Sequence, residues 1–585
     1  MFRLPLHSAV LAILYTVAGV SADAQTWCGK YYNSSQVSPS GATAPSGNFP
    51  LPAASQDPLL AFRCAPAIRP YLAEDMSSPV AVLIDSPVVY YEINGAQPIN
   101  LPSGSLTNAG TLSVTVSLDG KTLTNGTVPL NATAYELTFS LQDITPHMTA
   151  YNLSCQATYS AGSSSEQSFS TSAALSLLPN PTSGSVTKMD LRTGALLAKP
   201  ASGTGGDYEP IFPIGFYTGL DYLSLNTSVI DELGQQGFTI INLVPGSDDE
   251  VPSDEVLDRM QEAGLYLMYD MRYIYMDASA VTEQVNTFKN RTNLLLWYTG
   301  DEPDGSSDPL NATTSAYDLI YNLDGYHPVS LVLNCQDYYW TYYTAGTDIV
   351  MQDVYMVGVN VTFSNTYQTP CTPEYGDCGC DNCLSIPAGD TDAVPLGTSL
   401  SGSVPANSGV GTFFDISSRI DSFQNRMMVM GWERTKAVWT VPQAFGEEGY
   451  WVRNVTGEEW LVQSIVGINH GALGVVPWVD PTTPDIKGNA SSFALSLPKI
   501  TPFLFNSASV RSNYVVNGVD VATWRTSNQT LVLAANTNYV TKSVNWSDVG
   551  VNGTGATMVF AGGTTTTSSG FSLGSVGSGA FVVTL

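Results

Sequence analysis

Strand-like apolar runs and helix-like segments alternate through the middle of the chain, and this rhythm constrains the fold more than any other feature. We expect strands at 212–219, 238–246, 265–272, 293–303, 328–337, 348–357, 436–446 and 472–480. Helical patterns separate most of them, as at 253–264, where Ser253 is the expected N-cap. Eight such units over about 270 residues match a (β/α)8 barrel, which takes ~250 residues. A doubly wound open sheet is the alternative, but no glycine-rich phosphate loop follows the first strand.

β-rich sequence flanks this region on both sides. Short β runs with turn residues between them, including the hairpin signal "LDGK" at 118–121, predict a β-sandwich before the barrel. Short β runs return after the last barrel strand. The expected fold is therefore multidomain, with a central (β/α)8 TIM barrel, an N-terminal β-sandwich and a small C-terminal β-domain. The expected parts are a signal peptide at 1–24, a cysteine-containing N-terminal segment at 25–76, the β-sandwich at 77–185, a linker at 186–208, the catalytic barrel at 209–486 with a cysteine-rich insertion at 365–410, and the C-terminal β-domain at 487–585.

The first residues indicate where the protein works. Arg3 precedes a short apolar run, and Ala22 and Ala24 form an A-x-A pattern with cleavage expected after Ala24. The run is shorter than the roughly 20 residues of a membrane span. N-x-S/T acceptors are spread along the whole chain, as expected for a glycosylated surface. We therefore expect a secreted, extracellular protein.

The charge balance restricts the partners. Lys and Arg total 22 against 51 Asp and Glu, for a net charge of −29. Such a charge repels nucleic acid and anionic membranes, so neither is an expected partner, and a neutral or cationic substrate is favoured. No H-E-x-x-H spacing is present, and we expect no metal, no cofactor and a monomeric protein.

The eight cysteines, an even number, fit disulfides in an oxidising compartment. Four of them crowd into the segment "CTPEYGDCGCDNC", where a zinc knuckle is the alternative to disulfides. These four are Cys371, Cys378, Cys380 and Cys383. Cys28 and Cys64 are candidates to close the N-terminal segment, while the pairing of Cys155 and Cys335 is not readable.

The carboxyl ends of the barrel strands carry the candidate site, because active sites of such barrels gather there. Carboxylates, amides and aromatic rings dominate these ends, whereas none of the 4 histidines lies at one. The expected substrate-binding residues are Tyr217, Asn242, Asp270, Arg272, Asp337, Asp353, Tyr355, Gln443, Trp478 and Asp480. Asp270 and Arg272 are equally well explained as a mutual ion pair. His470 precedes the last strand and is expected to be structural.

Asp301 and Glu302 end the fourth strand, in "LLLWYTGDEPDG", and form the expected catalytic pair. A helix-capping turn is the structural alternative, since acidic residues before a helix are favourable. Glycoside cleavage needs a carboxylic acid to protonate the leaving group and a negative charge or nucleophile to stabilise an oxocarbenium-like transition state. Aromatic rings stack on sugars, and residues 338–343 form a Tyr- and Trp-rich loop after the fifth strand. The pattern therefore predicts a carbohydrate substrate.

A glutamate at the end of strand four, in a secreted barrel with β-domains on both sides, resembles the clan-A glycoside hydrolases. The resemblance implies that Glu302 is the general acid/base. The clan's nucleophile is a glutamate ending strand seven, where this chain has Gln443. Glu447 and Glu448 follow a few residues later and are the candidate replacements.

The Asp-Glu-Pro triplet at 301–303 resembles glycoside hydrolase families 20 and 123, the substrate-assisted β-hexosaminidases. This resemblance implies that Glu302 protonates the glycosidic oxygen while Asp301 orients a 2-acetamido group that acts as nucleophile. Tyr355 would bond the acetamide carbonyl, and Trp478 would form the floor of the sugar pocket.

The expected function is that of a secreted glycoside hydrolase acting on an extracellular glycan, with retention and with Glu302 as general acid/base. A substrate-assisted β-N-acetylhexosaminidase-like enzyme is one alternative. The other is a non-catalytic carbohydrate-binding or cell-wall protein that keeps the barrel as a scaffold.

Overall fold

The structure is a computed structural model of the chain. It describes residues 26–31, 39–41, 43–102, 110–160, 166–248, 250–376, 394, 411–552 and 554–585. The expected signal peptide, Cys378, Cys380, Cys383 and most of the expected cysteine-rich insertion lie outside the described residues.

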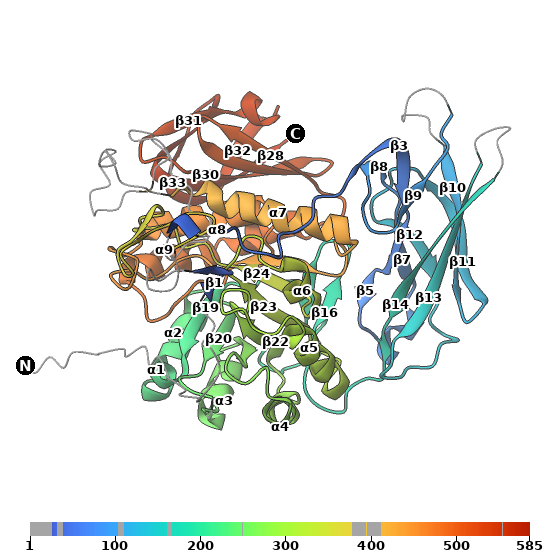
Figure 1. The fold of residues 1–585 in the computed structure, drawn as a ribbon, viewed down its shortest axis with the longest axis horizontal. Helices are drawn as coiled ribbons and strands as arrows, with labels where there is room; N and C mark the ends of the chain where they lie inside the picture. The colour runs from blue at the N-terminus through green and yellow to red at the C-terminus, as the bar shows by residue number, and fades with distance from the viewer. Residues whose placement is uncertain are drawn as a thin grey trace, which may run out of the picture.

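A curled parallel sheet of seven strands forms the centre of the molecule (Figure 1). In sheet order the strands are β19 (Gly215–Gly219), β20 (Ile240–Val244), β21 (Tyr266–Asp270), β22 (Leu294–Asp301), β23 (Val329–Leu333), β24 (Ile349–Gln352) and β27 (Ala437–Thr440). Nearly every side chain of these strands is buried, because helices cover the outer face and side chains fill the inside. The helices are α1 (Leu220–Leu225), α2 (Ser228–Gln235), α3 (Asp254–Glu262), α4 (Ala278–Phe288), α5 (Ala312–Leu323), α6 (Trp340–Ala345), α7 (Phe414–Met430) and α8 (Gly457–Asn469).

The segment 473–480 joins the two edges of this sheet. Its backbone bonds to β27, where Thr440 N–H donates to Gly474 O at 3.0 Å, and to β19, where Tyr217 N–H donates to Pro477 O at 3.1 Å. Only isolated bridges form there, because Pro477 has no N–H to donate to a ladder. The strand expected at 472–480 is thus an irregular connector. An open doubly wound sheet is excluded, because both edges of the sheet are occupied.

Local signals explain several elements of the barrel. Ser253 caps α3 by accepting from the Val256 N–H, as expected from the sequence. Helix α8 is buried along almost its whole length because it lies between the barrel and the C-terminal sheet, and its sequence is correspondingly apolar on most sides.

The N-terminal β-sandwich packs two sheets on one apolar core. One sheet has the order β11-β10-β13-β14 and the other β12-β7-β4. The strands are β4 (Arg63–Pro66), β7 (Val80–Asp85), β10 (Thr111–Leu118), β11 (Lys121–Pro129), β12 (Tyr135–Phe139), β13 (Tyr151–Tyr159) and β14 (Gln167–Leu175). The "LDGK" hairpin is confirmed, since Leu118 pairs with Lys121 across a turn in which Asp119 and Gly120 have positive φ.

Two expected boundaries differ from the structure. Strand β4 pairs with β7, so the sandwich begins before residue 77. The expected linker at 186–208 contains a hairpin of β16 (Lys188–Asp190) and β17 (Ala195–Ala198). Apolar residues such as Met189 and Leu196 bury this hairpin between the sandwich and the barrel. The Gly and Pro residues of this segment had indicated a linker instead.

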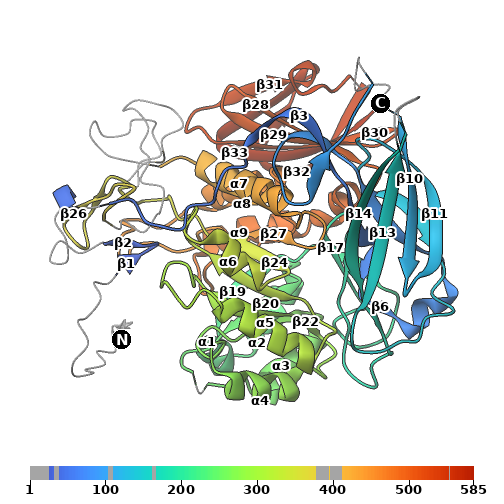
Figure 2. The same ribbon diagram turned by 45° about the vertical axis from the view of Figure 1, so that its right-hand side comes forward.

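The C-terminal part begins with helix α9 (Pro484–Ala494), capped by Thr483, so the expected boundary at 487 falls within a helix. An antiparallel sheet follows, built from β28 (Val510–Val516), β29 (Val519–Arg525), β30 (Gln529–Asn536), β31 (Lys542–Asn545), β32 (Thr554–Thr566) and β33 (Gly570–Thr584). Figure 2 shows this sheet and the sandwich on adjoining sides of the barrel. Among the described residues, no helix is both long and apolar enough for a membrane crossing.

Residues 26–31 form a small hairpin that we call the N-terminal strap. Strands β1 (Thr26–Trp27) and β2 (Lys30–Tyr31) pair across Cys28 and Gly29, both with positive φ. The strap is joined to the loop after β23 by the Cys28–Cys335 disulfide.

The expected closure of the N-terminal segment by Cys28 and Cys64 is wrong. Cys64 on β4 pairs instead with Cys155 on β13, which cross-links the two sheets of the sandwich. Cys371 is also disulfide-bonded. Disulfides are typical of an oxidising environment.

Candidate active site

Polar side chains gather at the carboxyl ends of the barrel strands. Asp270 ends β21 and Arg272 follows it; Asp301 ends β22 and Glu302 follows it; Asn334 follows β23, and Asp353 follows β24. The parallel sheet brings these ends to one rim, which the strand–helix rhythm predicts.

Arg272 is the central cation of the rim. Its Nη2 donates to Asp270 Oδ2 at 2.7 Å and its Nη1 donates to Asp301 Oδ2 at 2.8 Å. The rings of Tyr217, Tyr298 and Trp478 surround the guanidinium at 5.4, 5.6 and 4.9 Å from their centroids. Burial raises the pKa of Asp270 to about 6, although Arg272 opposes this shift. Asp270 and Arg272 therefore form an ion pair.

Asp301 is held on both carboxylate oxygens. Tyr298 OH donates to Oδ1 at 2.5 Å, while Arg272 binds Oδ2. The Asp301 side chain is 31% exposed, against 4% for Arg272. Asp301 is therefore the member of this ion-pair network that solvent can reach.

Glu302 is the strongest acid/base candidate by geometry. It has a positive φ of 51°, and it is partly exposed next to Asp301. Burial raises the pKa of Glu302 to about 7, while hydrogen bonds from Asp353 and Asn334 oppose the shift. Burial, followed by the charge of Glu302, raises the pKa of Asp353 well above its ordinary value. Burial therefore favours the protonated form of both carboxyl groups, which are hydrogen-bonded to each other.

Two residues of the site were not among the expected ones. Asn334 Nδ2 donates to Glu302 Oε1 at 2.9 Å. The Asp304 carboxylate accepts the N–H groups of Gly305 at 2.9 Å, Asn334 at 3.2 Å and Cys335 at 2.8 Å, which ties the loop after β22 to the loop after β23. Burial raises the pKa of Asp304 to about 8. Asp304 directly follows the expected fourth strand, at 293–303. Asn334 lies within the expected fifth strand, at 328–337, of which only Asp337 was among the expected site residues.

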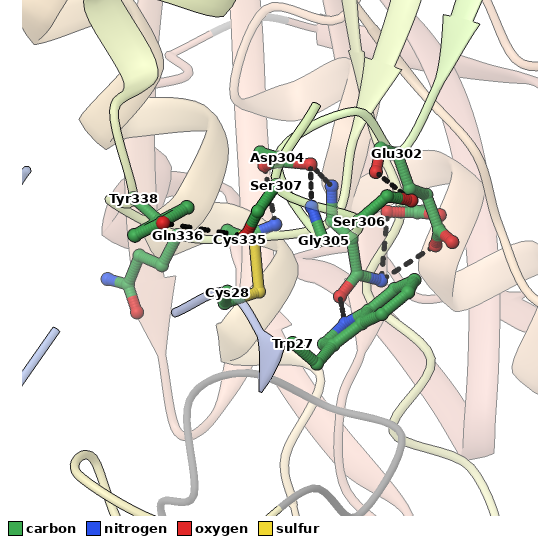
Figure 3. The surroundings of a disulfide bond; sticks show 12 residues. Trp27, Cys28, Glu302, Asp304, Gly305, Ser306, Ser307, Cys335, Gln336 and Tyr338 are labelled. Carbon is green, nitrogen blue, oxygen red and sulfur yellow. Dashed lines mark hydrogen bonds between the residues drawn. A yellow bond between two sulfur atoms is a disulfide. The ribbon is translucent and has the colours of Figure 1, made fainter. Parts of the chain in front are cut away.

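A third unexpected residue comes from the far N-terminus. Trp27 Nε1 donates to Asn334 Oδ1 at 2.9 Å. Figure 3 shows the Trp27 indole beside the Cys28–Cys335 disulfide and close to Glu302. No local pattern in the sequence connects Trp27 with a barrel strand 307 residues away.

Other expected site residues lie in structural contacts. The Gln443 amide is buried and bonds both the N–H and the carbonyl of Val357, at 2.9 and 3.0 Å. Asp480 is buried and pairs with Lys487 at 2.8 Å. Asp337 binds Arg426 at 3.0 Å and accepts the N–H of Phe49 at 2.9 Å.

Of the remaining expected residues, Tyr355 and Asn242 are buried, whereas Glu447 and Glu448 are exposed. Tyr355 is buried with its ring against Phe445 and Trp451. Asn242 is fully buried inside the barrel, and neither atom of its amide has a hydrogen-bond partner in the described part of the chain. Glu447 and Glu448 are exposed, and neither is among the main groups that set the pKa of Glu302.

Within the described ranges, no group of three or more His, Cys, Asp or Glu side chains is arranged to hold a metal ion. His470 lies away from the rim, between Asp421 and Asp520. Of the carboxyl groups at this rim, those of Asp301 and Glu302 are partly exposed, whereas Asp270, Asp304 and Asp353 are buried.

No protein-family model and no curated protein matches the chain. Among solved structures, it is similar to a β-glucuronidase from Ruminococcus gnavus, with 10% identity, a TM-score of 0.31, and coverage of 73% of this chain and 62% of that one. An FMN-binding β-glucuronidase from Facaelibacterium prausnitzii L2-6 has 12% identity, a TM-score of 0.27 and coverage of 81% and 67%. An α-amylase from Geobacillus thermoleovorans has 10% identity, a TM-score of 0.38 and coverage of 61% and 91%. At these values the likeness carries no argument about function.

Proposed function

We propose that this chain is an extracellular glycoside hydrolase in which Glu302 is the general acid/base. One observation carries the proposal: a partly exposed glutamate at the carboxyl end of a barrel strand whose pKa burial raises to about 7. A carboxyl group with such a pKa is protonated in mildly acidic to neutral solution and can give up its proton to a leaving group.

In this mechanism Glu302 gives its proton to the glycosidic oxygen while the bond from that oxygen to the anomeric carbon breaks. The alcohol leaves, and positive charge develops on the sugar ring next to the Asp301 carboxylate. A nucleophile takes the place of the alcohol on the anomeric carbon. In the second half of the reaction, ionised Glu302 takes a proton from the water that attacks the anomeric carbon, and the bond from this carbon to the nucleophile breaks.

Asp353 does not fit the role of nucleophile. Acid and nucleophile in retaining enzymes lie roughly 5 Å apart, with the sugar between them. Asp353 hydrogen-bonds Glu302 directly, which leaves no room for a sugar between the two carboxyl groups. Asp353 instead tunes the protonation of Glu302.

A substrate acetamide is the second candidate for the nucleophile. Asp301 favours it because Arg272 and Tyr298 hold its carboxylate rigidly while part of the side chain faces solvent. A carboxylate in this position can accept the N–H of a 2-acetamido group and direct its carbonyl oxygen toward the anomeric carbon. The exposed Glu447 and Glu448 are the protein alternatives.

The general-acid role is tested with Glu302→Gln on aryl glycosides whose leaving groups differ in acidity. We expect rates to fall about 10²- to 10⁴-fold for poor leaving groups, and far less for dinitrophenyl glycosides, which depart without a proton. Glu255→Gln is the matched control, because Glu255 is exposed on α3. Full activity of Glu302→Gln on every turned-over glycan would overturn the proposal, and binding of glycans without any turnover would favour the non-catalytic alternative.

The acetamide role is tested with substrate pairs that differ only at C2. We expect turnover of the 2-acetamido compound, little turnover of the 2-hydroxy compound, and a steep loss of rate as fluorine is added to the N-acyl group. Asp301→Asn should lower the rate on the acetamido substrate alone. Equal rates on both members of a pair would exclude substrate assistance and point to a protein carboxylate.

A further inference from the structure

The N-terminal strap is anchored over the rim of the barrel at three points. Cys28 N–H donates to Gly305 O at 3.2 Å, and the Cys28–Cys335 disulfide holds the two Cα atoms 5.6 Å apart. Gly376 N–H donates to Tyr31 O at 2.9 Å, which ties the strap to the segment after β24. The strap therefore has a defined position beside the site.

The Trp27 indole determines which way the Asn334 amide faces. An indole N–H can only donate, so the Asn334 atom 2.9 Å away must be the oxygen. The amide nitrogen then faces the two carboxyl groups, 2.9 Å from Glu302 Oε1 and 3.4 Å from Asp353 Oδ1. Every polar atom of this amide has a partner.

The backbone of Asn334 is fixed independently of Trp27. Its N–H donates to Asp304, and its carbonyl accepts from Arg419. Only the rotation of the side-chain amide is left to be decided, and Trp27 is the only described residue that donates to its oxygen. A turned amide would place a carbonyl oxygen against Glu302, where it disfavours the ionised carboxylate.

The ring of Trp27 is itself held in place. A Cβ atom on Gly305 would lie 2.5 Å from Cζ2 of the indole, so the ring packs directly on the Gly305 backbone. A glycine at this position therefore allows the indole to reach Asn334.

We propose that Trp27 is a positioning residue for the reaction: through its indole N–H it orients the Asn334 amide toward Glu302, and the Cys28–Cys335 disulfide keeps it there. This inference rests on the proposed role of Glu302 as general acid. The titratable and charged groups that face Glu302 are Arg272, Asp301, Asp304, Asp353 and Tyr355. Trp27 is uncharged, so its replacement by Phe removes none of these charges.

The first test is Trp27→Phe, which keeps an aromatic ring on Gly305 and removes the donor. Because Asn334 lowers the pKa of Glu302, loss of its orientation should raise that pKa by about half to one unit. We expect this upward shift in the basic limb of the pH profile of kcat/KM. The same shift should appear when the Glu302 carboxyl carbon is titrated by NMR of ¹³C-labelled protein. Its signal is assigned by comparison with Glu302→Gln.

Trp297→Phe is the matched control. Trp297 Nε1 also donates at 2.9 Å, but to Asp324, which lies beyond the opposite end of β22. This variant should lower stability and leave the titration of Glu302 unchanged. A shift equal to that of Trp27→Phe would mean that general loosening of the barrel, and not the indole N–H, moves the pKa.

Two further variants keep the inference testable if Trp27→Phe folds poorly. Gly305→Ala retains every hydrogen-bonding atom but displaces the indole, and it should shift the titration in the same direction. Trp27→Phe combined with Asn334→Ala should shift it no further than Asn334→Ala alone, because Trp27 acts through Asn334. The inference would be overturned if the shifts from Trp27→Phe and Asn334→Ala were additive in the double variant. It would also be overturned if neither Trp27→Phe nor Gly305→Ala shifted the titration of Glu302.

The NMR titration separates this inference from the proposed function. If the titration shifts as expected but Glu302→Gln is fully active, Trp27 orients Asn334 while Glu302 is not the general acid, and Trp27 has no role in the reaction. If Glu302→Gln is inactive and the titration does not shift, the proposed function stands and the positioning role is wrong.

Discussion

Arg272 carries one positive charge among two carboxylates and three aromatic rings. Its side chain is 4% exposed, and the Asp270 side chain bonded to it is fully buried. A buried carboxylate is stable only while it is paired or protonated, so Arg272 decides the charge state of Asp270.

We therefore expect Arg272→Gln to lower the free energy of unfolding of the barrel by about 3–5 kcal/mol at pH 7. The loss should be smaller at pH 5, because Asp270, whose pKa is already raised to about 6, then becomes neutral by protonation. Urea unfolding at both pH values measures the difference. Lys121→Gln, which breaks an ion pair whose partners are 66% and 79% exposed, should have no measurable effect at either. An equal loss at both pH values for Arg272→Gln would contradict this account.

The sequence indicated Asp301 and Glu302 as candidate site residues because they lie at the end of a buried strand. It did not predict Asn334, Asp304 or Trp27, because their importance depends on a loop–loop contact and a strap contact that no local pattern records. Gln443 was expected at the site for the converse reason: it ends the right strand, but its amide is used to hold Val357.

The elements of the barrel depend on glycine where two backbones meet closely. A Cβ on Gly215 in β19 would overlap the carbonyl oxygen of Ile240 in β20. Gly488 in α9 is the opposite case, since a Cβ there would meet nothing within 4 Å.

Gly215→Ala should therefore lower the free energy of unfolding by about 3 kcal/mol or more, because β19 and β20 must separate. Gly488→Ala should raise it by about 0.5–1 kcal/mol, since alanine favours the helix and restricts the unfolded chain. Denaturant unfolding of the two variants measures both changes in the free energy of unfolding, which should have opposite signs. A stable Gly215→Ala protein would show that the first two strands need not pair this closely.

Helices and strands were predictable in the barrel because burial imposes a regular apolar pattern on each of them. The eighth strand was only half right. Its apolar residues were correct, but Gly474 and Pro477 interrupt the ladder. The segment forms isolated bridges instead, in which N–H groups of β27 and β19 donate to the carbonyl oxygens of Gly474 and Pro477.

His470 links the barrel to the C-terminal sheet. Its ring bonds Asp421 on α7 at 2.8 Å and Asp520 on β29 at 2.9 Å. Burial opposes the charge, but the hydrogen bonds that the ring donates to both carboxylates raise the pKa of His470 to about 9, from an ordinary value of 6.5.

Because the folded pKa lies above the unfolded one, the stability from this contact is complete below about pH 6.5 and is lost as the pH rises through about 9. His470→Gln should therefore lower the unfolding temperature clearly at pH 6 and much less at pH 10. His147→Gln, in the sandwich, is the control, since that ring packs on Tyr151 instead. A difference for His470→Gln that does not change with pH would contradict the role of the charged ring.

Across the whole molecule, the acids of the rim whose pKa values burial raises all change the folding stability with pH in the same direction. Burial raises the pKa values of Asp270, Glu302 and Asp304 to about 6, 7 and 8. The folded chain thus binds more protons than the unfolded chain between about pH 4 and 8, so its stability falls as the pH rises through this window. The net charge of −29 adds to this trend, because self-repulsion grows as carboxylates ionise.

We expect the free energy of unfolding to be higher at pH 5 than at pH 7.5, by about 1.4 kcal/mol per pH unit for each acid that titrates in the window. Asp304→Asn should flatten the dependence, because it removes the acid with the highest of the three values. Urea midpoints across this range measure both effects. Rising stability from pH 5 to 7.5 would contradict them.

The overall division into sandwich, barrel and C-terminal sheet followed from the changing period of apolar residues. The boundaries and the cross-links did not, because the Cys28–Cys335 and Cys64–Cys155 disulfides, the pairing of β4 and the packing of the hairpin at 188–198 depend on segments apart in the sequence. A pairing such as Cys28 with Cys335 depends on the finished barrel, and the residues next to either cysteine in the sequence do not indicate it.

That pairing also has a consequence for biosynthesis. A chain made from its N-terminus exposes Cys28 long before Cys335, its partner 307 residues later, has emerged, while Cys64 and Cys155 become available in the meantime. Cys28 must remain reduced, or be released from a wrong partner by thiol exchange, until β23 has been made. The strap is therefore the first part of the described chain to be synthesised, but its disulfide can form only after the loop that follows β23 has been made.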